Sequence, residues 1–339
     1  MTGKVNLKAL SDALGLSRTT VSRALNGYDD VSAATRQRVE DAARAMGYVA
    51  DPTARRLATG RADMIGIVYP FGGDDLGDQR FAEVVAGITE QLAQHQYDFV
   101  IVAARPNAEL KTYRRLVDGK LVDALIVART LVDDPRIRYL QSSAFPYVAY
   151  GRTGIAEPYA WFDFDNEAGA RDAVRRLIGF GHRRIAMISA PLTLNFAAGR
   201  RMGFLSAMRE AGIAPDPALL VECPFTRDGG LCAAQSLLAQ AEPPTALLVD
   251  NNIAGGGALR ALVDSGLRLG QDISLIVYDG VPPDAARPYR VTAVAQPTGR
   301  ATGRALANIV LRLLADGRHG QQLEAPTIEA GNTDGPVRV

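Results

Sequence analysis

The chain contains few of the residues that build metal sites and disulfide frameworks. Its 339 residues include two cysteines, Cys223 and Cys232, which do not form a CxxC pair. The three histidines, His95, His182 and His319, lie far apart in the sequence. We therefore expect no metal site, and we expect both thiols to stay unpaired in a reducing compartment.

Long apolar runs are also absent. No stretch is long enough to cross a bilayer. The N-terminal residues MTGKVNLKALSD lack the unbroken apolar stretch and the cleavage site of a signal peptide. These absences predict a cytoplasmic protein with no membrane partner.

The motifs of common nucleotide-dependent and hydrolytic enzymes are missing as well. The sequence has no GxGxxG after its first predicted strand, no GxxxxGK(S/T) and no GxSxG. Gly255, Gly256 and Gly257 begin a predicted helix, but no Lys-Ser/Thr follows them as a phosphate loop requires. With no convincing nucleophile–base pair either, we expect neither an enzyme nor a bound cofactor.

Positive charge is concentrated at one end of a chain whose net charge is only +1. Residues 1–61 carry ten lysines and arginines against six acidic residues, a net charge of +4, whereas the remainder carries 28 against 31, a net charge of −3. A basic head on an acidic body suggests that only the head meets a polyanion. An ordinary solvated face explains the same charge, so charge alone leaves the partner open.

Three short helices are predicted in the first 47 residues. Asn6, Ser17 and Ser32 are suitable N-caps for the segments LKALSDALG, RTTVSRALNG and AATRQRVEDAARAMG, each of which ends in glycine. Only Gly15, Leu16 and Ser17 separate the first two helices. So short a turn forces the steep crossing of a helix-turn-helix.

The second of these helices is the candidate for reading DNA. Val21, Ala24 and Leu25 are expected to face the core. The polar side chains are then expected to face outward near the helix N-terminus, where they can bond to base edges and phosphates. They are Arg18, Thr19, Ser22 and Arg23. A small helical bundle with a polar outer face explains the same pattern.

The segment YVADPTARRLATGR predicts a short basic helix after the head. Asp51 is a plausible N-cap, Pro52 suits the first helical position, and Gly60 ends the helix. Leu57 stands among arginines, which suits a wedge that enters the minor groove while the arginines neutralise phosphates. A frayed linker whose leucine packs on the next domain would explain Leu57 but not the arginine cluster.

From Ala62 onward, apolar segments alternate with amphipathic helices. The predicted strands are MIGIVYP, DFVIVAA, ALIVA and FPYVAYG in a first series, and RIAMIS, ALLVE, ALLVD and ISLIVYD in a second. Continuous apolar strands between helices predict parallel sheets covered on both faces. The two series predict two similar lobes, with a ligand cleft at the carboxyl ends of their strands.

The head and the basic segment resemble the lactose/galactose repressor (LacI/GalR) family of bacterial transcription regulators. The resemblance rests on LSRTTVSRALNG, VSAATRQRV, MGYVADPTARRLATGR and IGIV, which occur in this order, although Ala50-Asp51-Pro52 replaces the family's usual Pro-Asn. It implies that one set of residues contacts the major groove and phosphates, and that a hinge helix contacts the minor groove. The first set is Asn6, Ser17, Arg18, Thr19, Thr20, Ser22, Arg23 and Asn26, and the hinge set is Ala54, Arg55 and Leu57.

The body resembles the effector domain of the same family through FDFDNEAGA, LIGFGHRRIAMI, AGRRMGF, LLVDNNIAGGGALRAL and ISLIVYD. This implies a two-lobed α/β fold like that of periplasmic binding proteins, with parallel sheets. Carboxylates, an arginine fork and an amide suit the hydroxyls of a sugar, and aromatic rings suit its apolar face. The expected effector-binding residues are Tyr69, Phe71, Trp161, Asp165, Phe196, Arg200, Asn251 and Asp279. Tyr69 and Trp161 have a simpler explanation as core residues, and His182 is expected to end a helix or bridge loops.

The chain departs from the family at the expected effector site. Asn252 and Gly280 stand where family members usually carry aspartate. Leu194 and Phe196 stand where purine-responsive members carry arginine and threonine. These substitutions argue against a purine and leave an uncharged sugar or oligosaccharide as the expected effector.

The resemblance implies a ligand-responsive repressor of carbohydrate-uptake or catabolic genes, which binds a palindromic operator as a homodimer in the nucleoid. A sugar-binding sensor without specific operator recognition is the alternative. The C-terminal residues lack a heptad pattern, so no tetramerisation helix is expected. The expected domains are a helix-turn-helix domain over 1–47, a hinge over 48–61 and an effector domain over 62–339, with a first lobe at about 62–162 plus 293–325 and a second at about 163–292.

Overall fold

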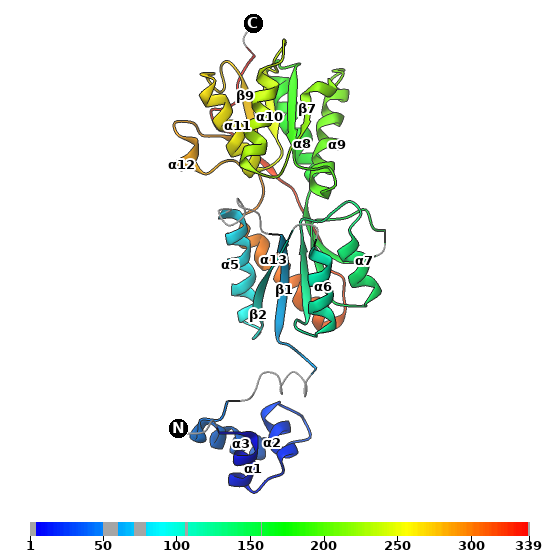
Figure 1. The fold of residues 1–339 in the computed structure, drawn as a ribbon, viewed down its shortest axis with the longest axis vertical. Helices are drawn as coiled ribbons and strands as arrows, with labels where there is room; N and C mark the ends of the chain where they lie inside the picture. The colour runs from blue at the N-terminus through cyan, green and yellow to red at the C-terminus, as the bar shows by residue number, and fades with distance from the viewer. Residues whose placement is uncertain (1–4, 50–59, 71–78, 106–107, 157, 338–339) are drawn as a thin grey trace. The chain divides into compact units, whose positions relative to one another are not determined.

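A computed structural model of the chain describes residues 5–49, 60–70, 79–105, 108–156 and 158–337. The chain divides into two compact units (Figure 1). The first consists of Met1–Asp63 and Lys120–Asp123, and the second consists of Met64–Gly119 and Ala124–Val339.

The first unit contains the three predicted helices. They are α1 (Leu7–Leu14), α2 (Arg18–Leu25) and α3 (Ala33–Met46). The side chains of Asn6, Ser17 and Ser32 each accept a hydrogen bond from a backbone N–H in the first turn of the helix that follows. The predicted N-caps are therefore confirmed, and with them the starts of the three helices, whereas the second helix ends at Leu25, two residues before the predicted Gly27.

A small apolar core holds these three helices together. Its buried members are Leu10, Leu14, Val21, Ala24, Val31, Val39 and Ala43. Since Val21 and Ala24 point into this core, the opposite face of α2 is exposed to solvent. A side chain of α3 supports the turn, because Arg38 Nη2 donates to the carbonyl oxygen of Leu14 at 2.8 Å.

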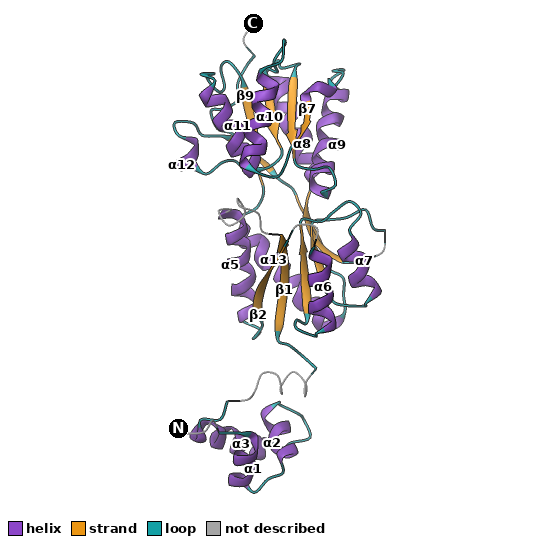
Figure 2. Cartoon of the chain, in the orientation of Figure 1, coloured by secondary structure: helices purple, strands orange, loops and turns teal. Residues whose placement is uncertain are grey.

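The second unit contains two sheets of mostly parallel strands, each covered by helices (Figure 2). The strand order of the first sheet is β11-β5-β4-β3-β1-β2. Its strands are β1 (Met64–Pro70), β2 (Asp98–Ala104), β3 (Ala124–Ala128), β4 (Tyr147–Tyr150), β5 (Ala160–Phe164) and β11 (Gln321–Glu324). The helices of this first lobe are α5 (Gln79–Ala93), α6 (Glu109–Asp118), α7 (Pro135–Ser142) and α13 (Gly299–Asp316).

The second sheet has the strand order β12-β10-β9-β8-β6-β7. Its strands are β6 (Ile185–Ser189), β7 (Leu220–Glu222), β8 (Ala246–Val249), β9 (Ser274–Tyr278), β10 (Thr292–Ala295) and β12 (Thr327–Glu329). Only the pairing of β10 with β12 is antiparallel among the pairings of the described strands. The helices of this second lobe are α8 (Asn166–Gly179), α9 (Asn195–Glu210), α10 (Arg227–Leu238), α11 (Asn252–Asp264) and α12 (Pro283–Ala286).

The two parallel series predicted from the sequence are therefore present. Strand order then determines where a ligand cleft can form. In the first sheet β1 lies between β3 and β2, and in the second sheet β6 lies between β8 and β7. The next two strands along the chain therefore lie on opposite sides of β1 in the first sheet and of β6 in the second. Such a reversal of strand order opens a crevice beside the carboxyl ends of these strands.

Two glycines of the run near the start of α11 (Asn252–Asp264) serve helix packing. A Cβ on Gly257 would lie 1.9 Å from the carbonyl oxygen of Arg227 on α10. A Cβ on Gly255 would lie 2.3 Å from a methyl carbon of Val277 on β9. Gly255 and Gly257 therefore allow α11 to approach its neighbours closely, which explains these two glycines without a bound phosphate.

The two cysteines are unpaired, as expected. Cys223 is buried, and burial raises the pKa of its thiol to about 11. Cys232 is exposed on α10. No helix in the described part of the chain is long and apolar enough to cross a membrane.

Candidate functional site

Most of the side chains that the sequence assigns to DNA contacts lie on α2 or cap its ends, and Asn6 caps α1. Asn6, Ser17, Arg18, Thr19 and Arg23 are exposed, and Thr20, Ser22 and Asn26 are half-buried. A hollow in this surface is lined by Leu7, Arg18, Thr19, Ser22, Arg23 and Tyr28. Arg18, Thr19, Ser22 and Arg23 thus share one face of α2, and Arg18 and Thr19 stand in its first turn, the part that contacts base edges in helix-turn-helix proteins.

Arg23 is held at one side of this face. Its Nη2 lies 2.7 Å from a carboxylate oxygen of Asp30, and its guanidinium carbon lies 4.9 Å from the centroid of the Tyr28 ring. These contacts place the guanidinium of Arg23 beside Asp30 and Tyr28. The predicted hinge residues Ala54, Arg55 and Leu57 lie outside the described residues.

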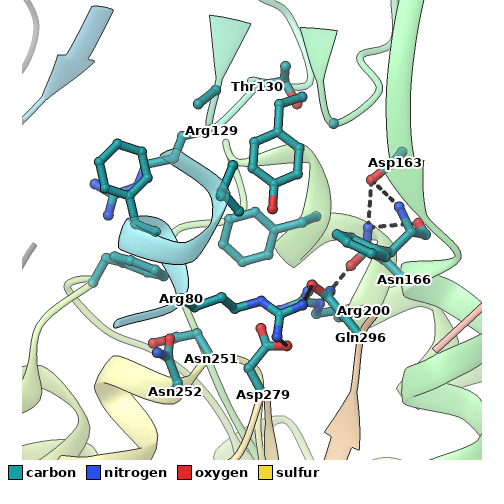
Figure 3. Close-up of a pocket in the computed structure, with 18 of the residues that line it drawn as sticks. Arg80, Arg129, Thr130, Asp163, Asn166, Arg200, Asn251, Asn252, Asp279 and Gln296 are labelled. Carbon is teal, nitrogen blue, oxygen red and sulfur yellow. Dashed lines mark hydrogen bonds and ion pairs between the residues drawn. The ribbon is translucent and has the colours of Figure 1, made fainter. Parts of the chain in front are cut away.

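The second unit contains a cavity at the carboxyl ends of its strands (Figure 3). Its walls surround about 850 Å³ of space, a figure that includes open solvent at the mouth. Both lobes contribute to it. The lining residues are Tyr69, Arg80, Phe81, Val84, Ala128, Arg129, Thr130, Tyr150, Gly151, Asp163, Phe164, Asn166, Phe196, Arg200, Phe225, Asn251, Asn252, Asp279 and Gln296.

Arg200 lies at the centre of a buried hydrogen-bond network in the cavity wall. Its Nε donates to Asn166 Oδ1 at 2.8 Å, and its Nη1 donates to the carbonyl oxygen of Asp250. Its guanidinium carbon lies 3.7 Å from the centroid of the Tyr278 ring and 4.8 Å from that of Phe196. The fork is therefore fixed in place before a ligand binds.

A buried carboxylate lies behind Arg200. Asp250 accepts hydrogen bonds from the backbone N–H of Ala190 at 3.0 and 3.1 Å and from Asn251 Nδ2 at 2.7 Å. Burial raises the pKa of Asp250, against the opposing effect of Arg200. Asn251 also caps α11, because its Oδ1 accepts from Ala254 N at 2.8 Å. Asn251 thus lines the cavity, and its side-chain amide also bonds to Asp250 and to the first turn of α11.

Two carboxylates line the cavity, and both have arginine partners. Asp279 Oδ1 lies 3.0 Å from Arg80 Nη1 (Figure 3). Asp163 Oδ2 lies 2.8 Å from Arg152 Nε, and its Oδ1 accepts from Asn166 Nδ2 at 3.2 Å. A hydroxyl-rich ligand would therefore meet carboxylates whose orientation is already set.

The aromatic walls come from both lobes. Tyr69 stacks on Phe81 with a centroid distance of 4.1 Å, and Phe196 meets Phe225 edge to face at 6.1 Å. The guanidinium carbon of Arg129 lies 4.7 Å from the ring centroids of both Tyr69 and Phe225. Such faces suit the apolar side of a sugar ring.

The structure brings together most of the effector residues expected from the sequence. Tyr69, Phe196, Arg200, Asn251 and Asp279 all line the cavity. Phe71 lies outside the described residues.

The other two expected residues do not line the cavity. Trp161 is near the beginning of β5, away from the strand's carboxyl end, and packs under Arg152 at 5.6 Å. Asp165 caps α8 by accepting a hydrogen bond from Ala168 N at 3.0 Å. The aspartate of this strand that reaches the cavity is Asp163, two residues earlier.

Several lining residues were missed by the sequence analysis. Arg129 and Tyr150 stand at the carboxyl ends of β3 and β4, so the strand pattern itself could have pointed to them. Arg80, Phe225 and Gln296 come from a helix and two connecting segments, and no local pattern distinguishes them.

His182 has the structural role that was expected. Its Nδ1 lies 2.9 Å from Thr245 Oγ1, and its Nε2 lies 2.9 Å from Ser274 Oγ and 3.0 Å from the carbonyl oxygen of Gly335. Burial lowers the pKa of His182 below its usual value. Among the described residues, no group of three or more His, Cys, Asp or Glu is placed to hold a metal ion.

Comparison with known proteins gives matches over both units. Residues 62–331 match the family of periplasmic binding proteins and the sugar-binding domain of the LacI family, and residues 7–51 match the bacterial regulatory proteins of the lacI family. The HTH-type transcriptional regulator RafR of Escherichia coli is 42% identical over 91% of this chain and 92% of its own length.

Solved structures give the same result. The lac repressor dimer bound to operator and the anti-inducer ONPF covers 97% of this chain and 99% of its own, with 26% identity and a TM-score of 0.81. The complex of the transcriptional regulator CelR with cellobiose covers 97% of this chain and 100% of its own, with 29% identity and a TM-score of 0.74. These relatives are regulators rather than enzymes, which confirms the prediction that the chain is not an enzyme. The chain therefore belongs to the LacI family of bacterial transcription regulators, which bind operator DNA through a helix-turn-helix domain and respond to small molecules.

Proposed function

We propose that this regulator represses carbohydrate-uptake or catabolic genes and that a neutral sugar, of about disaccharide size, controls its hold on DNA. The cavity supports this proposal most directly. It combines a fixed arginine fork, Arg200, with oriented carboxylates, Asp163 and Asp279, and with aromatic faces from both lobes. Sugars present both hydroxyls and an apolar ring face, so they use all of these groups at once.

The size of the proposed effector follows from one relative. The related regulator CelR has been solved with cellobiose. Phe196 lines the cavity where a purine-responsive member would carry threonine, which supports a sugar over a purine.

The proposed DNA-binding form is a homodimer on a palindromic operator, with one head per half-site and with the protein in the cytoplasm at the nucleoid. Two-fold symmetry in the protein matches two-fold symmetry in an operator. In this proposal the helix-turn-helix domain spans 1–47, the hinge spans 48–61, and the effector domain spans 62–339.

A gel-shift assay at fixed salt tests the proposal. The operator is selected from a random DNA pool, and neutral disaccharides, monosaccharides and nucleobases are then added one by one. We expect a sugar to change operator affinity by roughly 5–150-fold, the usual size of such coupling. Arg200→Ala and Asp279→Ala should remove this response.

Two results would contradict the proposal. If a nucleobase but no sugar changes the shift, the effector class is wrong. If selection yields no sequence that outcompetes random DNA at fixed salt, the protein is a sugar sensor without specific operator recognition.

A further inference from the structure

We propose that Arg129 is an effector-binding residue that helps to select the sugar, and that Arg136 is the positioning residue that holds it. The inference rests on the proposed function, because it requires the cavity to bind an effector.

Arg129 directly follows β3 and lines the cavity between aromatic rings of the two lobes (Figure 3). Its guanidinium carbon lies 4.7 Å from the centroid of Tyr69, on β1, and 4.7 Å from that of Phe225, which precedes α10. A guanidinium that lies over ring faces keeps its N–H groups along its planar edge. Donors arranged in this way can reach two adjacent hydroxyl oxygens of a sugar, and their direction can discriminate between epimers.

The backbone of Arg129 adopts a conformation that needs support. Its φ is +50°, in the left-handed region that side chains other than glycine rarely adopt. Arg136 Nη2 donates to the carbonyl oxygen of Arg129 at 2.9 Å. Strain of this kind persists only where surrounding structure holds it, and it collects at ligand sites.

Arg136 is fully occupied in this supporting role. Its side chain is only 5% exposed. Its Nε and Nη2 donate to the carboxylate of Asp134 at 2.9 and 2.7 Å, and its Nη1 donates to Glu109. Every nitrogen of its guanidinium therefore has a protein partner, so Arg136 acts on the effector only through Arg129.

Asp134 extends the same support to Leu131, two residues after Arg129. It is completely buried and accepts hydrogen bonds from the backbone N–H of Leu131 at 3.0 Å and of Arg136 at 3.0 Å. Burial alone would raise the pKa of Asp134, but the hydrogen bonds from Arg136 lower it below its usual value. The carboxylate thus remains charged and keeps the Arg129–Leu131 backbone in place.

The segment that carries Arg129 also bonds to the second lobe. Asn195 N donates to the carbonyl oxygen of Thr130 at 2.9 Å, and Val132 N donates to that of Thr193 at 2.9 Å. The residue after Asn195 is Phe196, which also lines the cavity. Arg129 is therefore fixed relative to both walls of the cavity, as a group that discriminates between ligands must be.

Binding of sugars to the full chain tests the first half of the inference. Calorimetry with cellobiose, lactose, maltose and melibiose would compare wild type, Arg129→Ala and Arg129→Lys. We expect Arg129→Ala to weaken the best sugar by roughly tenfold to a hundredfold, the usual effect of losing hydrogen bonds from a charged group. Arg129→Lys should change the order of preference among the four sugars. The control is Arg138→Ala, since Arg138 is exposed on the adjacent α7 and pairs with Asp133.

A double-mutant comparison tests the second half. Arg136→Met should weaken sugar binding by a similar factor, and Arg129→Ala with Arg136→Met should be no weaker than Arg129→Ala alone. If the double variant loses affinity by the product of the factors for the two single variants, Arg136 acts independently of Arg129, and its positioning role is overturned. If Arg136→Met does not fold, Glu109→Gln replaces it, with the expectation of a smaller loss that vanishes in the Arg129→Ala background.

The proposed role of Arg129 can be wrong while the proposed function stands, and the binding data distinguish the two cases. If wild type binds a sugar and Arg129→Ala binds it equally well with the same preferences, the inference alone is overturned. If wild type binds none of the four sugars or any other neutral saccharide, the proposed function is overturned, and this inference with it.

Discussion

Arg80 and Asp279 form an ion pair that joins the two lobes across the effector cavity. Arg80 Nη1, from the start of α5, lies 3.0 Å from Asp279 Oδ1, just after β9. Arg80 Nη2 also donates to Gln296 Oε1 at 3.2 Å and to the carbonyl oxygen of Pro297 at 2.9 Å. Arg80 of the first lobe therefore contacts Asp279, a proposed effector-binding residue, and also the segment that connects β10 to α13.

The Arg80–Asp279 pair should contribute measurably to stability. Its side chains are only 22% and 12% exposed, so solvent screens the pair weakly. In a double-mutant cycle with Arg80→Met and Asp279→Asn, we expect a coupling free energy of about 0.5–3 kcal/mol in urea unfolding. The exposed pair Arg260–Asp264, at 2.6 Å, is the control, with an expected coupling of about 0.3–0.5 kcal/mol. Equal coupling energies for the two pairs would contradict the prediction.

Arg18 should be required for sequence-specific DNA binding. It is exposed at the first position of α2, where an arginine can reach a base edge or a phosphate. We expect Arg18→Ala to weaken operator binding by about 1–3 kcal/mol in a titration at fixed salt. Arg209→Ala removes the same charge from an exposed position on α9 and should change operator affinity little. Similar losses for both variants would show that only net charge matters.

Leu57 should matter more for specific than for non-specific binding. A leucine wedge contributes only where the DNA step beneath it can be unstacked, whereas arginines act on any duplex. Leu57→Ala should therefore reduce operator affinity by a larger factor than affinity for random DNA, measured at the same salt concentration. Arg55→Ala is the comparison and should weaken both. Equal losses for Leu57→Ala on both DNAs would remove the wedge role.

His182 should make the stability of the second unit sensitive to acid. Burial lowers the pKa of His182 from its ordinary value of 6.5, so the folded protein resists a proton that the unfolded chain accepts. Its contribution is therefore complete above pH 6.5 and is lost progressively as the pH falls from 6.5 through the lower pKa of the folded state. His182→Gln should show a shallower loss of urea stability than wild type in this range. His319→Gln, at an exposed position, should keep the slope of wild type.

The sequence by itself determined the DNA-binding head and the alternation of strands and helices. Asn6, Ser17 and Ser32 cap helices within three residues of themselves, and Val21 and Ala24 mark the buried face of α2 by their spacing. Interactions over such short separations are readable from the chain because the fixed geometry of a helix relates neighbouring positions.

Only the tertiary structure decided which residues surround the effector. Asp163 and Asp165 look equivalent in the sequence, yet the first lines the cavity and the second caps α8. In the sequence, Arg80 looks like a solvent-exposed charge at the start of an amphipathic helix. In the structure, the order of the strands places Asp279 beside it. Strand order, lobe contact and the left-handed turn at Arg129 depend on residues far apart in the chain, and no local period encodes them.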